Sequence, residues 1–280
     1  MNMNGILSIK EAVEGYIAGA AGKAKASACS IFMKAIMAGA MIALGAQGSS
    51  VAAHAIENVG VARLVAGCVF PVGLMMVITM GAELFTGDCL IAMAVADKKV
   101  TLMGFVRILV LVFLGNLVGG MLIAWMTMAT GQFDYSSGLL GAYTIKVALG
   151  KATMPFAKAL VSGILCNILV SAAVIMAFCG KDLAGKLWAS FFVIMLFVTS
   201  GFEHCVANMY YISAGLFAKM NPDYAAKAAD AYGIAADKLA NLDWMHFFVT
   251  NLIPVTIGNI IGGSVAVGLM LYYLNCAKKN

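Results

Sequence analysis

Charged residues are scarce in this sequence of 280 residues: they make up 11 %, whereas hydrophobic residues make up 62 %. A soluble domain is typically about 25 % charged and about 45–50 % apolar, so a water-soluble globule is excluded because its surface could not be covered. The 18 Lys and Arg stand against 13 Asp and Glu and form no dense basic block, which argues against nucleic-acid binding. The apolar content also excludes disorder. The composition indicates a membrane protein with several spans.

Motifs that mark enzymes, metal sites and exported proteins are missing as well. The seven cysteines form no C-x-x-C pair, so we expect neither a disulfide framework nor a zinc site. The chain has no H-E-x-x-H, no paired intramembrane aspartates and no Ser/His pair at nucleophile-elbow spacing, so no enzyme and no cofactor are expected. The first thirty residues contain no continuous apolar core, which argues against a signal peptide.

The N-terminal segment 1–29 is predicted to hold an amphipathic helix at the cytoplasmic membrane surface, from Ser8 to about Ala26. Ser8 and Glu11 have the spacing of a capping box, in which each side chain accepts a hydrogen bond from the other residue's backbone. Helical periodicity places four apolar residues on one face, namely Ile9, Val13, Tyr16 and Ile17.

Six apolar segments are long enough to cross a membrane, since a spanning helix needs about 20 apolar residues. They lie at about 30–53, 63–96, 102–130, 154–178, 187–217 and 244–274. The second and fifth are too long for one helix and are expected to be broken. With the N-terminus inside, eleven Lys and Arg lie on the inner side and seven on the outer side. This bias predicts cytoplasmic termini, with a channel domain over 30–274 and a tail over 275–280.

Two motifs recur in the same order in the two halves of the chain, 30–130 and 154–274. The sequence G-N-hydrophobic-hydrophobic-G-G occurs at 115–120 and at 258–263, and the expected helix breaks lie at 81–88 and 201–208. Because each half has three spans, an odd number, the second half must be inverted relative to the first, as in many channels and transporters. The glycines are expected to pack helices closely together.

Three ionisable residues fall at membrane depth, where insertion costs at least ~2.5–3.5 kcal/mol each. Glu83 and Glu203 occupy equivalent places in the two breaks. We expect them to accept N–H groups freed there, with a proton relay as the alternative. His204 is the only histidine in the middle of a span, and we expect it to donate a hydrogen bond to a substrate in a pore between the breaks. Thr86 would offer a hydroxyl from the opposite break.

Other features of the breaks point to a small anion. The N-termini of two half-helices aim at the membrane centre, where their N–H groups and dipoles favour negative charge. Lys151, near the outer mouth, would attract anions, or it would only anchor a helix end by snorkelling. Asn167 lies one to two turns further inside. Five apolar residues are candidates for constrictions that gate by excluding water, or for simple core, namely Phe70, Leu74, Leu84, Phe85 and Phe197.

Three segments carry a resemblance to a known family. Residues 202–209 match F-E-H-x-x-A-N-M, residues 81–86 match G-x-E-L-F-T, and residues 251–259 read N-L-I-P-V-T-I-G-N. Together they resemble the formate–nitrite transporter family over nearly the whole chain. The resemblance implies an all-α, aquaporin-like subunit in a homopentamer in the lipid bilayer of the bacterial inner membrane. It also implies passage of formate, nitrite, hydrosulfide or acetate, with protons as partners.

The resemblance also implies roles for individual residues. His204 would sit in the pore centre near Thr86, and Lys151 and Asn167 would form a vestibule pair. Val170 would join the five constriction residues named above. Asn208 would support the broken loops together with Glu83 and Glu203. The N-terminal helix would influence gating.

The expected function is therefore a pH-dependent channel, most simply for formate. Protonation near His204 would let a neutral acid cross the apolar constriction. Cys205 stands where formate channels often carry Ser, so nitrite and hydrosulfide remain alternatives. A water or polyol channel is a remote alternative because the chain has no Asn-Pro-Ala loop. An ammonium channel is disfavoured because a single histidine lies at membrane depth.

Overall fold

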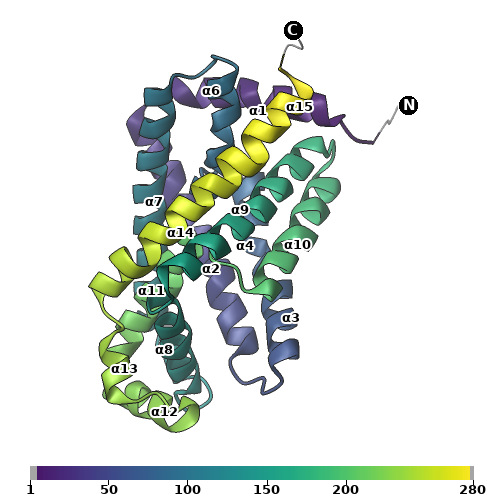
Figure 1. The fold of residues 1–280 in the computed structure, drawn as a ribbon. Coiled ribbons are helices and arrows are strands. Elements are labelled where there is room, and N and C mark those ends of the chain that lie inside the picture. Colours follow the sequence, from purple (N-terminus) through teal and green to yellow (C-terminus); the bar gives the residue numbers. More distant parts are fainter. Residues whose placement is uncertain (1–4, 278–280) are drawn as a thin grey trace.

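A computed structural model describes residues 5–277 and is built from helices (Figure 1). Within this range six helical spans are long and apolar enough to cross a membrane. Listed in chain order, they are α2 (Ala28–Ala53), α3 and α4 (Val59–Val69 and Val72–Thr79), α7 (Leu102–Ala129), α9 (Phe156–Cys179), α10 (Leu183–Ser200) and the stretch His246–Asn275. The last comprises η3 (His246–Leu252), α14 (Ile253–Ile260), η4 (Ile261–Leu269) and α15 (Met270–Asn275). These spans confirm the predicted fold class.

Both predicted helix breaks are present. After α4 the chain turns at Gly81 (φ +63°) and resumes as a half-span of α5 (Phe85–Asp88), η1 (Cys89–Ile91) and α6 (Ala92–Ala96). After α10 it turns at Gly201 (φ +73°) and resumes as α11 (Cys205–Lys219). Only glycine adopts these positive φ values without strain, so each turn depends on its glycine.

The repeated glycines bring the third helix of each half against the first. In α7, Gly119 lies against the Ile36 carbonyl of α2, and in η4, Gly262 lies against the Ile164 carbonyl of α9. A side chain at either position would overlap backbone atoms, so the small residues set these close crossings. The two halves therefore use one packing scheme, in agreement with the predicted inverted repeat.

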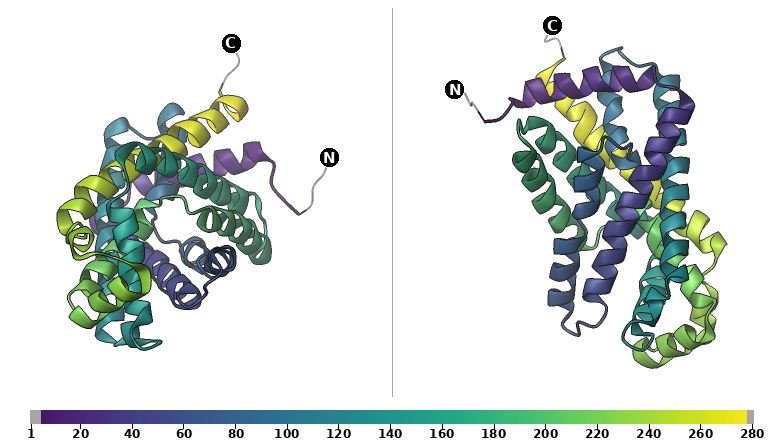
Figure 2. Two further views of the ribbon diagram at one scale, coloured as in Figure 1. Left: turned by 60° about the horizontal axis from the view of Figure 1, so that its bottom comes forward. Right: turned by 180° about the vertical axis from the view of Figure 1, so that it is seen from behind.

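The N-terminal helix α1 (Ile9–Ala24) has the predicted capping box. Val13, Tyr16 and Ile17 are buried, but Ile9, at the first position of the helix, is 42 % exposed and does not share their environment. Helices α1 and α15 lie at one end of the bundle (Figure 2). Helices α12 (Pro222–Tyr232) and α13 (Ala236–Ala240) lie at the other end. The last residues of the predicted tail, 278–280, are outside the described range.

A helix between the third and fourth spans was not predicted. It is α8 (Leu139–Ala152), preceded by the short turn η2 (Gln132–Asp134). Buried Leu140, Ile145 and Ala148 hold it against the bundle, and Gly215 of α11 contacts it at Ala148. Helix α8 precedes the second half as α1 precedes the first, so each half is preceded by a packed helix.

Candidate functional site

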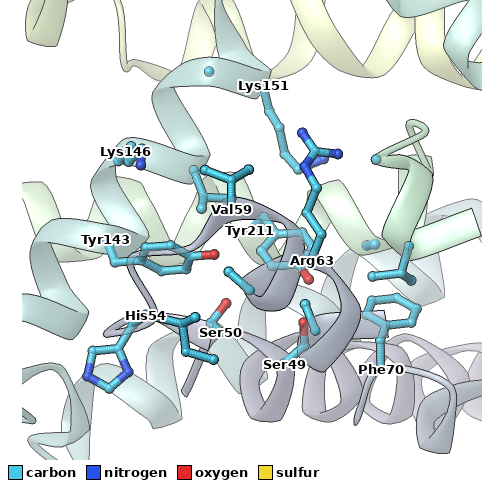
Figure 3. Close-up of a pocket in the computed structure, with 18 of the residues that line it drawn as sticks. Ser49, Ser50, His54, Val59, Arg63, Phe70, Tyr143, Lys146, Lys151 and Tyr211 are labelled. Carbon is cyan, nitrogen blue, oxygen red and sulfur yellow. The ribbon is translucent and has the colours of Figure 1, made fainter. Parts of the chain in front are cut away.

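Two cavities enter the bundle from opposite ends. The larger, about 720 Å³ in volume, is lined by α8, α3 and the break between α10 and α11, and we call it the α8 cavity (Figure 3). The smaller, about 310 Å³ in volume, is lined by α1, α4 and the break between α4 and α5, and we call it the α1 cavity. His204 lies on the wall of the first, and Glu83 and Leu84 lie on the wall of the second.

A hydrogen-bonded contact joins the two half-spans between these cavities. The Thr86 hydroxyl of α5 lies 3.0 Å from Nε2 of His204, the residue that begins α11. Both side chains are buried. The structure thus brings together the two residues that the sequence placed on opposing breaks.

The other ring nitrogen of His204 determines its tautomer. Nδ1 accepts a hydrogen bond from the Ala207 backbone N–H at 3.1 Å, so it caps the N-terminus of α11. An acceptor nitrogen carries no proton, and the network therefore assigns the hydrogen of the neutral ring to Nε2. This N–H faces Thr86. Protonation of Nδ1 would remove the cap from Ala207.

Apolar side chains line both cavities near this contact. The Phe70 and Phe197 rings pack edge to face, with centroids 5.6 Å apart, on the wall of the α8 cavity. Leu74 lies on the wall of the α1 cavity. Among the remaining constriction candidates, Phe85 lines neither cavity. Its ring packs edge to face on the Phe113 ring, with the ring centroids 5.4 Å apart.

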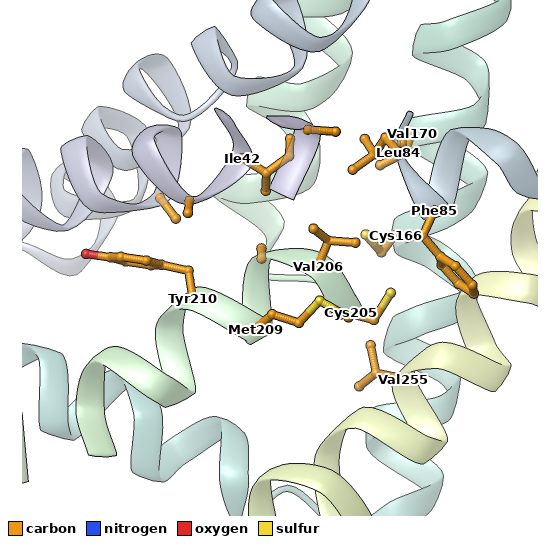
Figure 4. Packing of buried hydrophobic residues seen from close by; sticks show 14 of the residues in the cluster. Ile42, Leu84, Phe85, Cys166, Val170, Cys205, Val206, Met209, Tyr210 and Val255 are labelled. Atoms are coloured by element: carbon orange, nitrogen blue, oxygen red, sulfur yellow. The ribbon is translucent and has the colours of Figure 1, made fainter. Parts of the chain in front are cut away.

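Val170 is buried and also lines neither cavity. It lies with Leu84 and Phe85 in the packed core around Cys166 (Figure 4). The six constriction candidates therefore divide into four cavity residues and two core residues.

Two equivalent asparagines hold the breaks. Asn116 Oδ1 accepts the Phe85 N–H at 2.9 Å, and its Nδ2 donates to the carbonyls of Glu83 and Ala35. Asn259 Oδ1 accepts the Cys205 N–H at 3.0 Å. Its Nδ2 donates to two carbonyls, those of Glu203 and Gly163. The sequence predicts that the glutamates accept the N–H groups freed at the breaks. This prediction is wrong for the N–H groups of Phe85 and Cys205, because an asparagine side chain can accept an N–H and donate to carbonyls at the same time.

The two glutamates instead bind lysines. Lys151, in the last turn of α8, donates to Glu203 Oε1 at 2.7 Å, and Asn208 donates to Glu203 Oε2 at 2.7 Å. Lys23, in the last turn of α1, pairs with Glu83 and lies 2.6 Å from Asp88 Oδ1. Burial alone lowers the pKa of Lys23, but Asp88, Tyr16 and Glu83 raise it above its ordinary value.

Asn167 does not lie beside Lys151 on a cavity wall. It is buried, and its Nδ2 donates to the Thr86 carbonyl at 3.1 Å and to the Asn259 carbonyl at 2.6 Å. It therefore ties the first break to the sixth span, whereas Lys151 lines the α8 cavity.

Sequence reasoning missed two charged residues at the site. Asp88 lies within the break motif and becomes a second carboxylate for Lys23. Arg63, counted only as an outer-side charge, points into the α8 cavity (Figure 3). Its place on the first turns of α3, facing the second break, depends on how α3 packs on α10. Between residues 5 and 277, no three His, Cys, Asp or Glu side chains are placed to hold a metal ion.

Comparisons with known proteins agree on one family. The model of the family described as Formate/nitrite transporter matches residues 10–273. The chain is 39 % identical over 247 residues to the formate channel FocA of Haemophilus influenzae, covering 87 % of this chain and 86 % of that protein. A solved structure of a pentameric formate channel with formate bound has a TM-score of 0.80 and 34 % identity, and the match covers 88 % of this chain and 97 % of that one.

The fold is also shared more widely. The aquaglyceroporin of Plasmodium falciparum matches with a TM-score of 0.51 at 15 % identity, over 89 % of this chain and all of that one. This likeness concerns the fold alone and supports the predicted aquaporin-like architecture.

Proposed function

This chain belongs to the formate/nitrite transporter family of multi-pass membrane proteins, and we propose that it passes small monovalent anions, most simply formate. The family is one of transporters and not of enzymes. Two matches support formate: one relative is named a formate channel, and one solved relative is described with formate bound. Nitrite, which the family name includes, and hydrosulfide are the alternatives at the same site.

The observation that carries this proposal is the contact of Thr86 with His204 between two cavities. An anion would leave the α8 cavity past the apolar rings of Phe70 and Phe197. A bare charge is costly there unless a hydrogen bond compensates for it. The Nε2–H of His204, directed at Thr86, is the donor available to a small anion at this point.

Protons are proposed partners because a neutral acid crosses an apolar constriction at lower cost than its anion. Since Nδ1 of His204 caps α11, the ring acts in this scheme as a neutral donor. The proton that accompanies formate would then come from the bulk solution that the α8 cavity opens to, so its supply would follow the pH on that side. Formic acid would leave past Leu84 and Leu74 into the α1 cavity.

We also propose a homopentamer in the bacterial inner membrane with cytoplasmic termini. The solved formate channel is pentameric. Exposed apolar side chains on the bundle surface, such as Leu64, Leu114 and Phe192, suit contact with lipid or with neighbouring subunits. The placement of α1 and α15 at one end of the bundle agrees with an even number of spans.

Flux measurements in liposomes test this function. Wild-type protein should carry formate in stopped-flow assays at several pH values, and nitrite and hydrosulfide should be compared under the same conditions. His204→Phe should remove most of the formate flux because it removes the donor. His204→Asn is the matched control, since its amide keeps both a donor and an N-cap acceptor. Unchanged, pH-sensitive flux in His204→Phe would contradict the proposal.

A further inference from the structure

The α8 cavity contains three cations, and their partners differ. Lys151 forms an ion pair with Glu203, with Nζ 2.7 Å from Oε1. Lys146 lies over the Tyr232 ring, 4.4 Å from its centroid, and is exposed. Arg63 has no carboxylate oxygen within 4.0 Å in the described part of the chain. The positive charge near the second break that has no carboxylate partner among the described residues is therefore that of Arg63, and not that of Lys151.

The Arg63 guanidinium is placed over the turn that leads to His204. Its Nη1 donates to the Thr199 carbonyl, in the last turn of α10, at 3.3 Å. The same nitrogen lies against Gly201, where a Cβ atom would come within 2.6 Å of it. The other guanidinium nitrogens have no hydrogen-bond partner among residues 5–277. One contact thus fixes the group while the remaining donors stay free at the cavity wall.

We propose that Arg63 is an anion-binding residue of the α8 cavity that selects planar anions with two oxygens. A guanidinium presents two parallel N–H groups, which fit both oxygens of formate or nitrite at once. Hydrosulfide and chloride offer a single atom and engage no such fork. The proposal rests on the proposed anion passage and adds to it the substrate class that the α8 cavity prefers.

Chemical protection tests binding without any flux. The chain has two arginines, and the second, Arg107, lies on α7 near Ala26. Purified wild-type protein is treated with phenylglyoxal in formate or in chloride of equal ionic strength, and modification is read by mass spectrometry. Formate should slow modification of Arg63 several-fold more than chloride does, with Arg107 unchanged. Equal modification of Arg63 in the two salts would overturn the proposal.

Flux ratios test selection. In liposomes, Arg63→Lys keeps the charge but removes the fork, so the ratio of formate flux to hydrosulfide flux should fall about tenfold, which corresponds to about 1.4 kcal/mol. Lys146→Gln, in the same cavity, should leave the ratio unchanged. A ratio does not depend on how much variant protein folds. An unchanged ratio of formate flux to hydrosulfide flux in Arg63→Lys would contradict selection by Arg63. A wild-type protein that carries neither anion would instead contradict the proposed function. In that case the protection experiment would still decide whether Arg63 binds formate.

Discussion

The two halves of this chain repeat one scaffold around different charges. In each half an asparagine of the third helix holds the break of the second, through Asn116 in one half and Asn259 in the other. A lysine from a preceding helix then pairs with the glutamate of that break. In the second half the cluster holds one lysine and one carboxylate, Lys151 and Glu203. In the first half Lys23 binds two carboxylates, those of Glu83 and Asp88.

This difference indicates which parts of the repeat are structural. Groups that satisfy the broken backbone are the same in both halves, because every buried N–H and carbonyl must find a partner at membrane depth. Groups that set the electric field differ between the halves. In the α8 cavity the Arg63 guanidinium has no carboxylate partner among the described residues, whereas Lys23 at the α1 cavity pairs with two carboxylates. Anion recognition is therefore expected to be stronger at the α8 end.

Removing an asparagine should have the largest effect. Asn116→Ala or Asn259→Ala leaves an N–H and a carbonyl of the break without partners, those of Phe85 and Glu83 or of Cys205 and Glu203, at about 1–3 kcal/mol each. Both variants should lower the melting temperature in detergent strongly and to a similar extent. Asn58→Ala, which removes an exposed helix cap, is the control and should cost only about 1 kcal/mol. A stable Asn116→Ala beside an unstable Asn259→Ala would break the equivalence of the two halves.

Removing a lysine should distinguish the two clusters. Lys151→Met leaves Glu203, which is 2 % exposed, without its ionic partner, and breaking a buried pair in this way costs about 3–5 kcal/mol. The double variant Lys151→Met/Glu203→Gln should recover most of this loss in thermal unfolding. If the double variant is no more stable than Lys151→Met, the pair is not what holds the second break.

Asp88→Asn should have a moderate effect on transport and little on folding. It leaves Lys23 with Glu83 alone and makes the α1 end more positive. Formate entry from that side, measured in vesicles of one orientation, should rise about twofold to threefold at low salt and less at high salt. A rise that is independent of ionic strength would show that the charge of Asp88 is not the cause.

The capping box of α1 should give the smallest effect. The Ser8 hydroxyl donates to Glu11 Oε2 at 2.7 Å and the Ser8 backbone N–H donates to the same oxygen at 2.8 Å, and these hydrogen bonds lower the pKa of Glu11 below its ordinary value of 4.5. Because the folded-state pKa is depressed, the contribution is complete above pH 4.5 and is lost as pH falls through the lowered value. Limited proteolysis of α1 should therefore accelerate slightly in acid. Glu11→Gln should remove this acid response, and an unaltered response would assign it to another group.

Much of the fold could be predicted from the sequence because its signals are local. Apolar length defines the spans, and Gly81 and Gly201 mark turns that other residues could not adopt without strain. The facing positions of Thr86 and His204 follow from the inverted repeat. The partners of Glu83 and Glu203 could not be predicted, because Lys23 and Lys151 reach them only after α1 and α8 have packed on the bundle.

Two further residues show the same limit. Helix α8 was missed because its 14 residues are too short for a span, and its burial depends on packing against α11 and other distant segments. The direction of the Arg63 side chain depends on the rotation of α3 against α10. From the sequence alone, Arg63 near the end of a span could therefore be used only to predict the orientation of the spans in the membrane. Asn167 was expected on a cavity wall, but its place is set by the Asn259 carbonyl of a distant helix.

The central claim is that His204 serves as a neutral donor and that the anion, rather than the ring, takes up the proton. The pH dependence of formate flux through His204→Asn in liposomes tests it most directly. Asparagine donates a hydrogen bond and caps Ala207 but does not titrate. We predict that this variant retains a formate flux that rises as pH falls, as in the wild type. A formate flux through His204→Asn that no longer changes with pH would contradict the claim.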